Sequence, residues 1–160
     1  MRRALSIFLA VLALMAITTA TALAAITFHD GPDLTWDGNS ATVTGDLSGL
    51  GNTPATATLT VSSFATYTCQ NPGGNTAPGQ TSVAVFGSPG TQTLSTAKNG
   101  RATLDVTASA PAPAETVSGK AAGCPNGRWI GVDPQLTGPT TATLTITQGN
   151  KLIFTQTYEQ

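Results

Sequence analysis

The stretch ATATLTVSSFATYTCQ, residues 55–70, constrains the fold of this chain more than any other. From Ala57 to Cys69 every second residue is Ala, Leu, Val, Ser, Tyr or Cys, and nearly all the residues between them are Thr or Ser. An alternation of period two that is rich in β-branched residues is typical of a strand with one buried face. The sequence therefore predicts one long strand over residues 55–70, near the end of which lies Cys69.

Shorter strand signals, separated by turn residues, occupy most of the remaining chain. Asp37-Gly38 and Asn99-Gly100 are strong signals for tight hairpin turns. Residues 29–33 are expected to form a turn and residues 71–80 an irregular loop, because both are rich in turn formers. The other predicted strands are residues 26–28, 34–36, 41–44, 82–86, 91–96, 101–108, 129–132, 141–148 and 152–158.

No window after residue 25 shows a helical period. Short strands with turns at regular spacing in a chain of this length favour a single sandwich domain. We therefore predict an all-β, antiparallel, immunoglobulin-like β-sandwich of about seven to nine short strands, with no helix beyond the N-terminal segment.

Residues 1–24 have the features of a cleaved secretory signal peptide. Arg2 and Arg3 precede an apolar run over residues 4–17, and Ala22-Leu23-Ala24 fits the pattern read by signal peptidase. The run is shorter than the roughly 20 residues that a membrane span needs, although an uncleaved anchor is the alternative. We therefore expect residues 25–160 to form one secreted domain without a membrane span, either released or associated with the cell wall.

Charged residues make up only 9% of the chain. Loss of Arg2 and Arg3 with the signal peptide would leave five basic residues against eight acidic ones, a net charge of about −3. No basic patch remains, which argues against nucleic acid as a partner. A polar but charge-poor surface suits an extracellular protein better than a cytosolic enzyme.

The two cysteines, Cys69 and Cys124, form an even pair in a chain expected to be secreted, so we predict a disulfide between them. A two-cysteine metal site is the alternative, but close ligand spacing and a nearby histidine are missing. Asp30, Asp33 and Asp37 could offer oxygens to calcium, but their spacing does not match the EF-hand pattern. We expect neither a metal nor a cofactor.

The stretch TAKNGRATLDV, residues 96–106, resembles a hairpin of immunoglobulin-like domains. The chain is similar in style to small secreted immunoglobulin-like proteins of high-GC Gram-positive bacteria, which are mostly uncharacterised. The same hairpin is similar to one in neocarzinostatin-type apoproteins, secreted carriers of a small chromophore that usually have two disulfides. The resemblance implies an extracellular domain, with small-ligand carriage as a minor alternative, and no binding residue is carried over from it.

The chain departs from antibody-type domains at both ends of the expected bridge. Trp129 follows the second cysteine instead of standing between the two, and Cys124 lies in a Cys-Pro-Asn-Gly turn. The bridge is therefore expected to tie a strand end to a loop, away from the centre of the core.

The sequence offers no convincing catalytic set. His29 is the one histidine, and no Gly-x-Ser-x-Gly elbow accompanies it. Asp105, Glu115 and Glu159 are not placed as a pair of carboxylates for glycoside cleavage. We expect no catalytic residue and predict that the protein is not an enzyme.

Aromatic side chains are better candidates for a binding surface. Trp36, Tyr67, Trp129 and Tyr158 could stack on sugar rings or anchor a protein partner, and the other use for them is to fill the core. Trp129 follows Arg128 in a loop that the disulfide would hold beside residues 71–80. The predicted contact residues are therefore Trp129, Arg128, Asn71, Asn75 and Asn126.

These features favour a secreted, non-enzymatic module with an interaction or structural role at the cell surface, whose partner is an unknown extracellular protein. A module that binds carbohydrate or a cell-wall polymer is the alternative. Self-association through the C-terminal edge strand, residues 152–158, is a further expectation.

Overall fold

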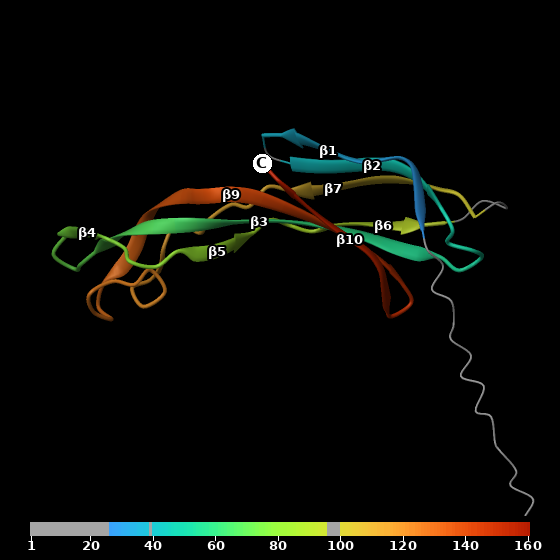
Figure 1. Cartoon of the computed structure of the whole chain (residues 1–160). Coiled ribbons are helices and arrows are strands. Elements are labelled where there is room, and N and C mark those ends of the chain that lie inside the picture. Colours follow the sequence, from blue (N-terminus) through green and yellow to red (C-terminus); the bar gives the residue numbers. More distant parts are fainter. Residues whose placement is uncertain (1–25, 39, 96–99) are drawn as a thin grey trace, which may run out of the picture.

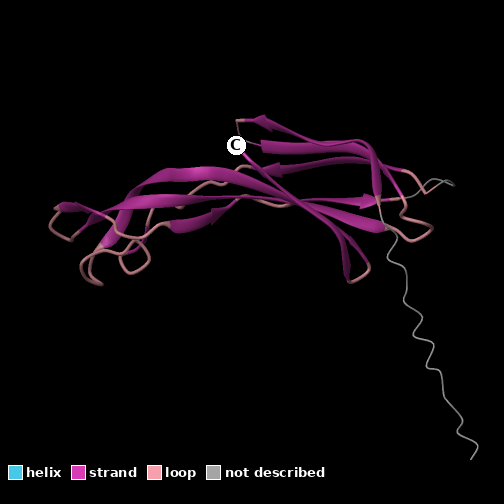
Figure 2. Ribbon diagram, viewed as in Figure 1, coloured by secondary structure: helices cyan, strands magenta, loops and turns pink. Residues whose placement is uncertain are grey.

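The computed structural model describes residues 26–38, 40–95 and 100–160. Every regular element in these ranges is a strand, and none is a helix (Figure 2). Within the same ranges no helix is long and apolar enough to cross a membrane. The predicted signal peptide and the turn residues Asn39, Lys98 and Asn99 lie outside the described residues.

The described residues form ten strands in two antiparallel sheets, which confirms the predicted all-β class. The smaller sheet has the order β1-β2-β7 and the larger one contains the other seven strands, with β3 and β9 at its centre. The smaller sheet consists of β1 (Thr27–Asp37), β2 (Ser40–Ser48) and β7 (Ala102–Ser109). The larger sheet consists of β3 (Ala55–Gln70), β4 (Thr76–Pro78), β5 (Val83–Phe86), β6 (Gly90–Leu94), β8 (Val117–Ser118), β9 (Ile130–Gln148) and β10 (Lys151–Glu159).

Strands β3 and β9 form a ribbon that runs the length of the molecule, whereas the smaller sheet covers only one end of it (Figure 1). The bounds of β3 are those predicted from its alternating sequence, and its odd-numbered residues are buried along its whole length. The expectation of short strands is wrong for β9, which has 19 residues.

Strand β9 replaces two separate strands expected over residues 129–132 and 141–148. Pro134 and the Gly138-Pro139 pair suggest breaks, yet the chain continues through them beside β3. The pairing with β3 shifts register twice along this length, as it does at β-bulges. A bulge accommodates proline because it removes the need for a ladder hydrogen bond at that position.

A first core cluster fills the space between the two sheets. It is built from small and medium-sized side chains, and half-buried Phe28, Trp36, Phe154 and Tyr158 pack against its margin. The cluster consists of Ala41, Val43, Leu47, Leu50, Ala55, Ala57, Leu59, Val61, Leu94, Ala102, Leu104, Val106, Ala108, Ala142, Leu144 and Ile146.

A second core cluster lies under the other end of the β3–β9 ribbon, beyond the smaller sheet. Its buried members are Ala65, Tyr67, Cys69, Val85 and Ala122. The predicted disulfide is present, with an S–S distance of 2.05 Å, and it ties the end of β3 to a loop. The long loop between β7 and β9 is thereby fixed over this end of the sheet.

The predicted hairpin around Asn99-Gly100 is wrong, because β6 pairs with β3 and β7 pairs with β2 in the other sheet. The side chain of Gln92 on β6 nevertheless bonds to the backbone of β7. Its Nε2 donates to the Thr103 carbonyl at 3.2 Å, and its Oε1 accepts from the Asp105 N–H at 2.8 Å. The backbones come so close that a Cβ at Gly90 would lie 1.8 Å from the Thr107 carbonyl oxygen.

On the opposite side, β10 closes against β1. The Phe28 and Phe154 rings lie 4.9 Å apart between centroids, and the Tyr158 hydroxyl donates to the Pro32 carbonyl. The turn expected over residues 29–33 is wrong, since β1 continues through these residues with two register shifts against β2. The two sheets are thus joined along both long sides of the sandwich.

Candidate functional site

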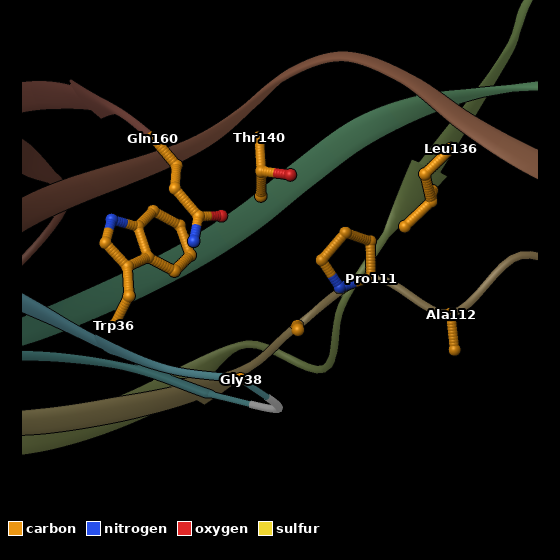
Figure 3. A pocket seen from close by; sticks show the side chains of 8 residues that line it. Trp36, Gly38, Pro111, Ala112, Leu136, Thr140 and Gln160 are labelled. Atoms are coloured by element: carbon orange, nitrogen blue, oxygen red, sulfur yellow. The ribbon is translucent and has the colours of Figure 1, made fainter.

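A pocket with a volume of about 400 Å³ opens where the two sheets meet beside the start of the long loop (Figure 3). The residues around it come from four separate parts of the chain and include one tryptophan. They are Trp36, Gly38, Ala110, Pro111, Ala112, Leu136, Thr140 and Gln160.

Backbone pairing holds these side chains in place. Trp36 lies near the end of β1, where it pairs with Ala41 of β2. Leu136 and Thr140 both belong to β9; Leu136 pairs with Ala65 of β3, and Thr140 lies in the unpaired stretch between Thr137 and Thr141. Gln160 follows β10 and donates its N–H to the Thr140 carbonyl at 3.0 Å. Strands thus position Trp36, Leu136 and Thr140, whereas the lining residues 110–112 lie in the loop that follows β7.

The lining combines apolar surfaces with uncharged polar groups. Trp36, Pro111 and Leu136 supply the apolar part, and the Leu136 side chain is 48% exposed. The Thr140 hydroxyl and the Gln160 amide supply donors and acceptors, and Figure 3 shows the amide directed toward the indole of Trp36. None of the eight lining residues carries a side-chain charge. An uncharged ligand with an apolar face and several hydroxyls matches this surface.

The loops predicted as a contact site are also brought together. Asn71 and Arg128 line a shallow hollow of about 300 Å³, with Gln70, Pro72, Gly74 and Ile130. The Asn71 Oδ1 accepts from the N–H groups of Gly73 and Asn75, both at 2.9 Å, so it stabilises its own turn.

The remaining predicted contact residues lie outside the lining of this hollow. Asn126 accepts from the Arg128 N–H through its Oδ1 at 3.1 Å. Trp129 is half-buried and packs against the second core cluster. Trp36, one of the four aromatic residues that the sequence suggests for a binding surface, does line a pocket.

His29 contacts a serine, which is one ingredient of a hydrolase site. Its Nε2 lies 2.8 Å from the Ser48 Oγ, and both side chains are on the paired strands β1 and β2. Among the described residues no carboxylate contacts the imidazole to orient it. The contact between His29 and Ser48 is therefore an exposed polar pair between two neighbouring strands, next to a β-bulge.

An acidic hollow of about 260 Å³ lies on the smaller sheet, where Asp30, Asp33, Asp46 and Asp105 are among the lining residues. The Asp46 carboxylate accepts from the Thr103 hydroxyl at 3.0 Å. No group of three His, Cys, Asp or Glu side chains in the described part of the chain is placed to hold a metal ion.

Of the three hollows described above, the Trp36 pocket alone combines an aromatic ring with apolar side chains and uncharged polar groups. Comparison of the chain with protein-family models, curated proteins and solved structures finds no match.

Proposed function

We propose that this protein is a secreted, non-enzymatic binding module of the cell surface, and that the Trp36 pocket binds an uncharged carbohydrate. The observation that carries the proposal is the placement of the Trp36 indole beside the Thr140 hydroxyl and the Gln160 amide.

Sugars suit this combination for a physical reason. One face of a pyranose ring presents C–H groups that pack on an aromatic ring, while its edge presents hydroxyls that need hydrogen-bond partners. The pocket volume of about 400 Å³ lies within the range of small-ligand sites. The disulfide supports an extracellular location, because such bonds persist in oxidising compartments.

Binding is tested with the purified, oxidised protein, residues 25–160, by titrating soluble cell-wall oligosaccharides and following Trp fluorescence. Co-sedimentation with insoluble polysaccharides extends the test to polymers. We expect Trp36→Ala to weaken binding at least tenfold, because it removes the stacking surface.

Trp129→Ala is the matched control, because it removes the chain's other tryptophan from a position outside the pocket lining. It should lower stability through lost packing on the second cluster while leaving affinity unchanged. Loss of binding in Trp129→Ala but not in Trp36→Ala would move the site to the hollow beside Arg128. Absence of binding to any glycan would reject the carbohydrate function.

A protein partner is the second candidate, and two exposed aromatic residues favour it. Phe64 and Phe86 are 51% and 66% exposed. The register places both on the outer face of the larger sheet, because Phe86 pairs with Ser62, two residues from Phe64. Exposed aromatic side chains are common anchors of protein interfaces. Cross-linking on intact cells should give a defined product with the wild type that disappears when Phe64 and Phe86 are both replaced by Ser.

A further inference from the structure

The Leu136 side chain belongs to the inner face of the larger sheet, yet the described part of the chain leaves nearly half of it uncovered. Leu136 pairs with Ala65 of β3, and directly paired residues of antiparallel strands point to the same face of their sheet. Ala65 is fully buried in the second core cluster, whereas Leu136 is 48% exposed. Leu136 therefore gives the Trp36 pocket an apolar surface that a bound ligand would remove from water.

This apolar surface lies away from the indole, at the other end of the pocket. Figure 3 shows Trp36 and Leu136 at the two ends of the lining, with Ala112 on the side of Leu136 and Pro111 between the ends. A sugar hydroxyl placed against Leu136 and Ala112 would lose water without gaining a hydrogen-bond partner, which weakens binding. A methyl group suits this end of the pocket, because burying it there is favourable.

The polar groups of the lining are available to a ligand. Among the described residues, no hydrogen bond joins the Thr140 hydroxyl or the Gln160 side-chain amide to another group. A hydroxyl and a carboxamide can each donate and accept a hydrogen bond. An acetamido substituent combines a methyl group with one N–H donor and one carbonyl acceptor, so it matches an apolar surface that adjoins a free hydroxyl.

We infer that the Trp36 pocket selects sugars that carry an N-acetyl group, and that Leu136 is the specificity-determining residue. The acetyl methyl packs on Leu136, the acetamido group bonds to the Thr140 hydroxyl, and the Gln160 amide serves the ring hydroxyls beside the indole. The inference rests on the proposed carbohydrate function and adds to it the class of sugar. The absence of charge on all eight lining side chains agrees with it, because an acetamido group is uncharged.

The test compares two linear oligosaccharides of the same linkage and length, one of N-acetylglucosamine and one of glucose. They differ in a single substituent on each ring, which is acetamido in the first and hydroxyl in the second. The oxidised protein, residues 25–160, should bind the N-acetylglucosamine oligomer about tenfold more tightly, through one buried methyl group and one hydrogen bond. In saturation-transfer NMR the protons of the acetyl methyl should receive more saturation than the ring protons.

Leu136→Ala tests the assigned residue. It should weaken binding of the N-acetylglucosamine oligomer about fourfold, as loss of one methyl burial does, and leave the affinity for the glucose oligomer unchanged. Leu152→Ala is the matched control, because Leu152 is a 55% exposed leucine outside the pocket lining, and it should change neither affinity. The comparison of the two oligomers on the wild type stands even if Leu136→Ala is unstable.

The outcomes separate the inference from the function on which it rests. Equal affinity for the two oligomers, with binding still lost in Trp36→Ala, would overturn the inference and leave the carbohydrate function intact. A full preference for the N-acetylglucosamine oligomer in a folded Leu136→Ala variant would overturn the role of Leu136. Binding of another uncharged glycan without binding of the N-acetylglucosamine oligomer would overturn the selection for N-acetyl groups. Failure of the wild type to bind any glycan would reject the proposed function itself.

Discussion

The Tyr158 hydroxyl donates a hydrogen bond to the Pro32 carbonyl at 3.0 Å, and in this way the last strand is joined to the first. The two residues stand 126 positions apart in the chain. On the other side of the sandwich the Gln92 amide bridges β6 and β7. Each long side of the sandwich is therefore closed by one polar side chain that bonds to the main chain of the opposite sheet.

Tyr158→Phe should reduce stability at neutral pH by about 1 kcal/mol, through loss of the bond to Pro32. The substitution should also change how the free energy of unfolding depends on pH at alkaline pH. Burial raises the pKa of the Tyr158 hydroxyl above its ordinary value of 10.0, and the negative charge of Asp33 raises it further. The unfolded chain then ionises at lower pH than the folded one, so wild-type stability falls as the pH rises above about 10.

Urea unfolding between pH 7 and pH 11 measures both effects. In Tyr158→Phe the free energy of unfolding should fall less at alkaline pH than in the wild type, because the contribution of Tyr158 ionisation is absent. Parallel curves for the two proteins would mean that Tyr158 is not linked to the decline.

Gln92→Ala should destabilise the sandwich by about 1 to 2 kcal/mol, because the Asp105 N–H and the Thr103 carbonyl both lose a partner. Gln92→Glu should be equally harmful, since an oxygen would replace the nitrogen that donates to Thr103. Chemical unfolding gives the free energies. Gln135→Ala, at an exposed glutamine on β9, is the control and should change stability by less than about 0.5 kcal/mol.

Gly90→Ala should cost about 3 kcal/mol or prevent folding, because the added methyl would lie 1.8 Å from the main-chain oxygen of Thr107. A backbone atom cannot move aside as a flexible side chain can. Gly127→Ala is the matched control, since nothing lies within 4 Å of a Cβ there. Comparable melting temperatures for the two variants would show that β6 and β7 do not approach this closely in solution.

Loss of the disulfide should act mainly on the end of the molecule that contains the second core cluster. The bridge closes a loop of 55 residues, for which the chain-entropy model gives roughly 4 kcal/mol. In the Cys69→Ala, Cys124→Ala double variant, hydrogen exchange should accelerate first around Tyr67 and Ala122. Uniform acceleration that includes β2 and β7 would instead show that the two clusters unfold together.

The sequence predicts the strands well where the alternation of apolar and polar residues is local and unbroken. Strand β3 is the clearest case, and the pairing of β1 with β2 follows the Asp37-Gly38 hairpin signal. The Asn99-Gly100 signal misleads, because a turn signal gives a change of direction without specifying which strand becomes the partner. Pro134 and Pro139 mislead for a related reason, since only pairing with β3 shows that they lie within one strand.

The candidate pocket lies beyond what local patterns can predict. Trp36 and Leu136 are 100 positions apart, and they share a lining only because β1 and β9 lie in facing sheets. The disulfide predicts that Asn71 and Arg128 lie close together, and both do line one hollow, beside the pair Gln70 and Ile130 that joins β3 to β9. The place of Trp129 in a loop predicts a surface residue, and the sequence does not reveal that this residue packs against a second cluster.

The continuous β3–β9 ribbon has a mechanical consequence. The described chain enters through β1 and leaves through β10, and both strands belong to the end that holds the first cluster. The chain reaches the disulfide-linked end through β3 and later returns through β9. A force applied between the two termini would therefore act on the end that holds the first cluster. The disulfide-linked end would carry none of this force, and in a tethered molecule it could extend away from the point of attachment.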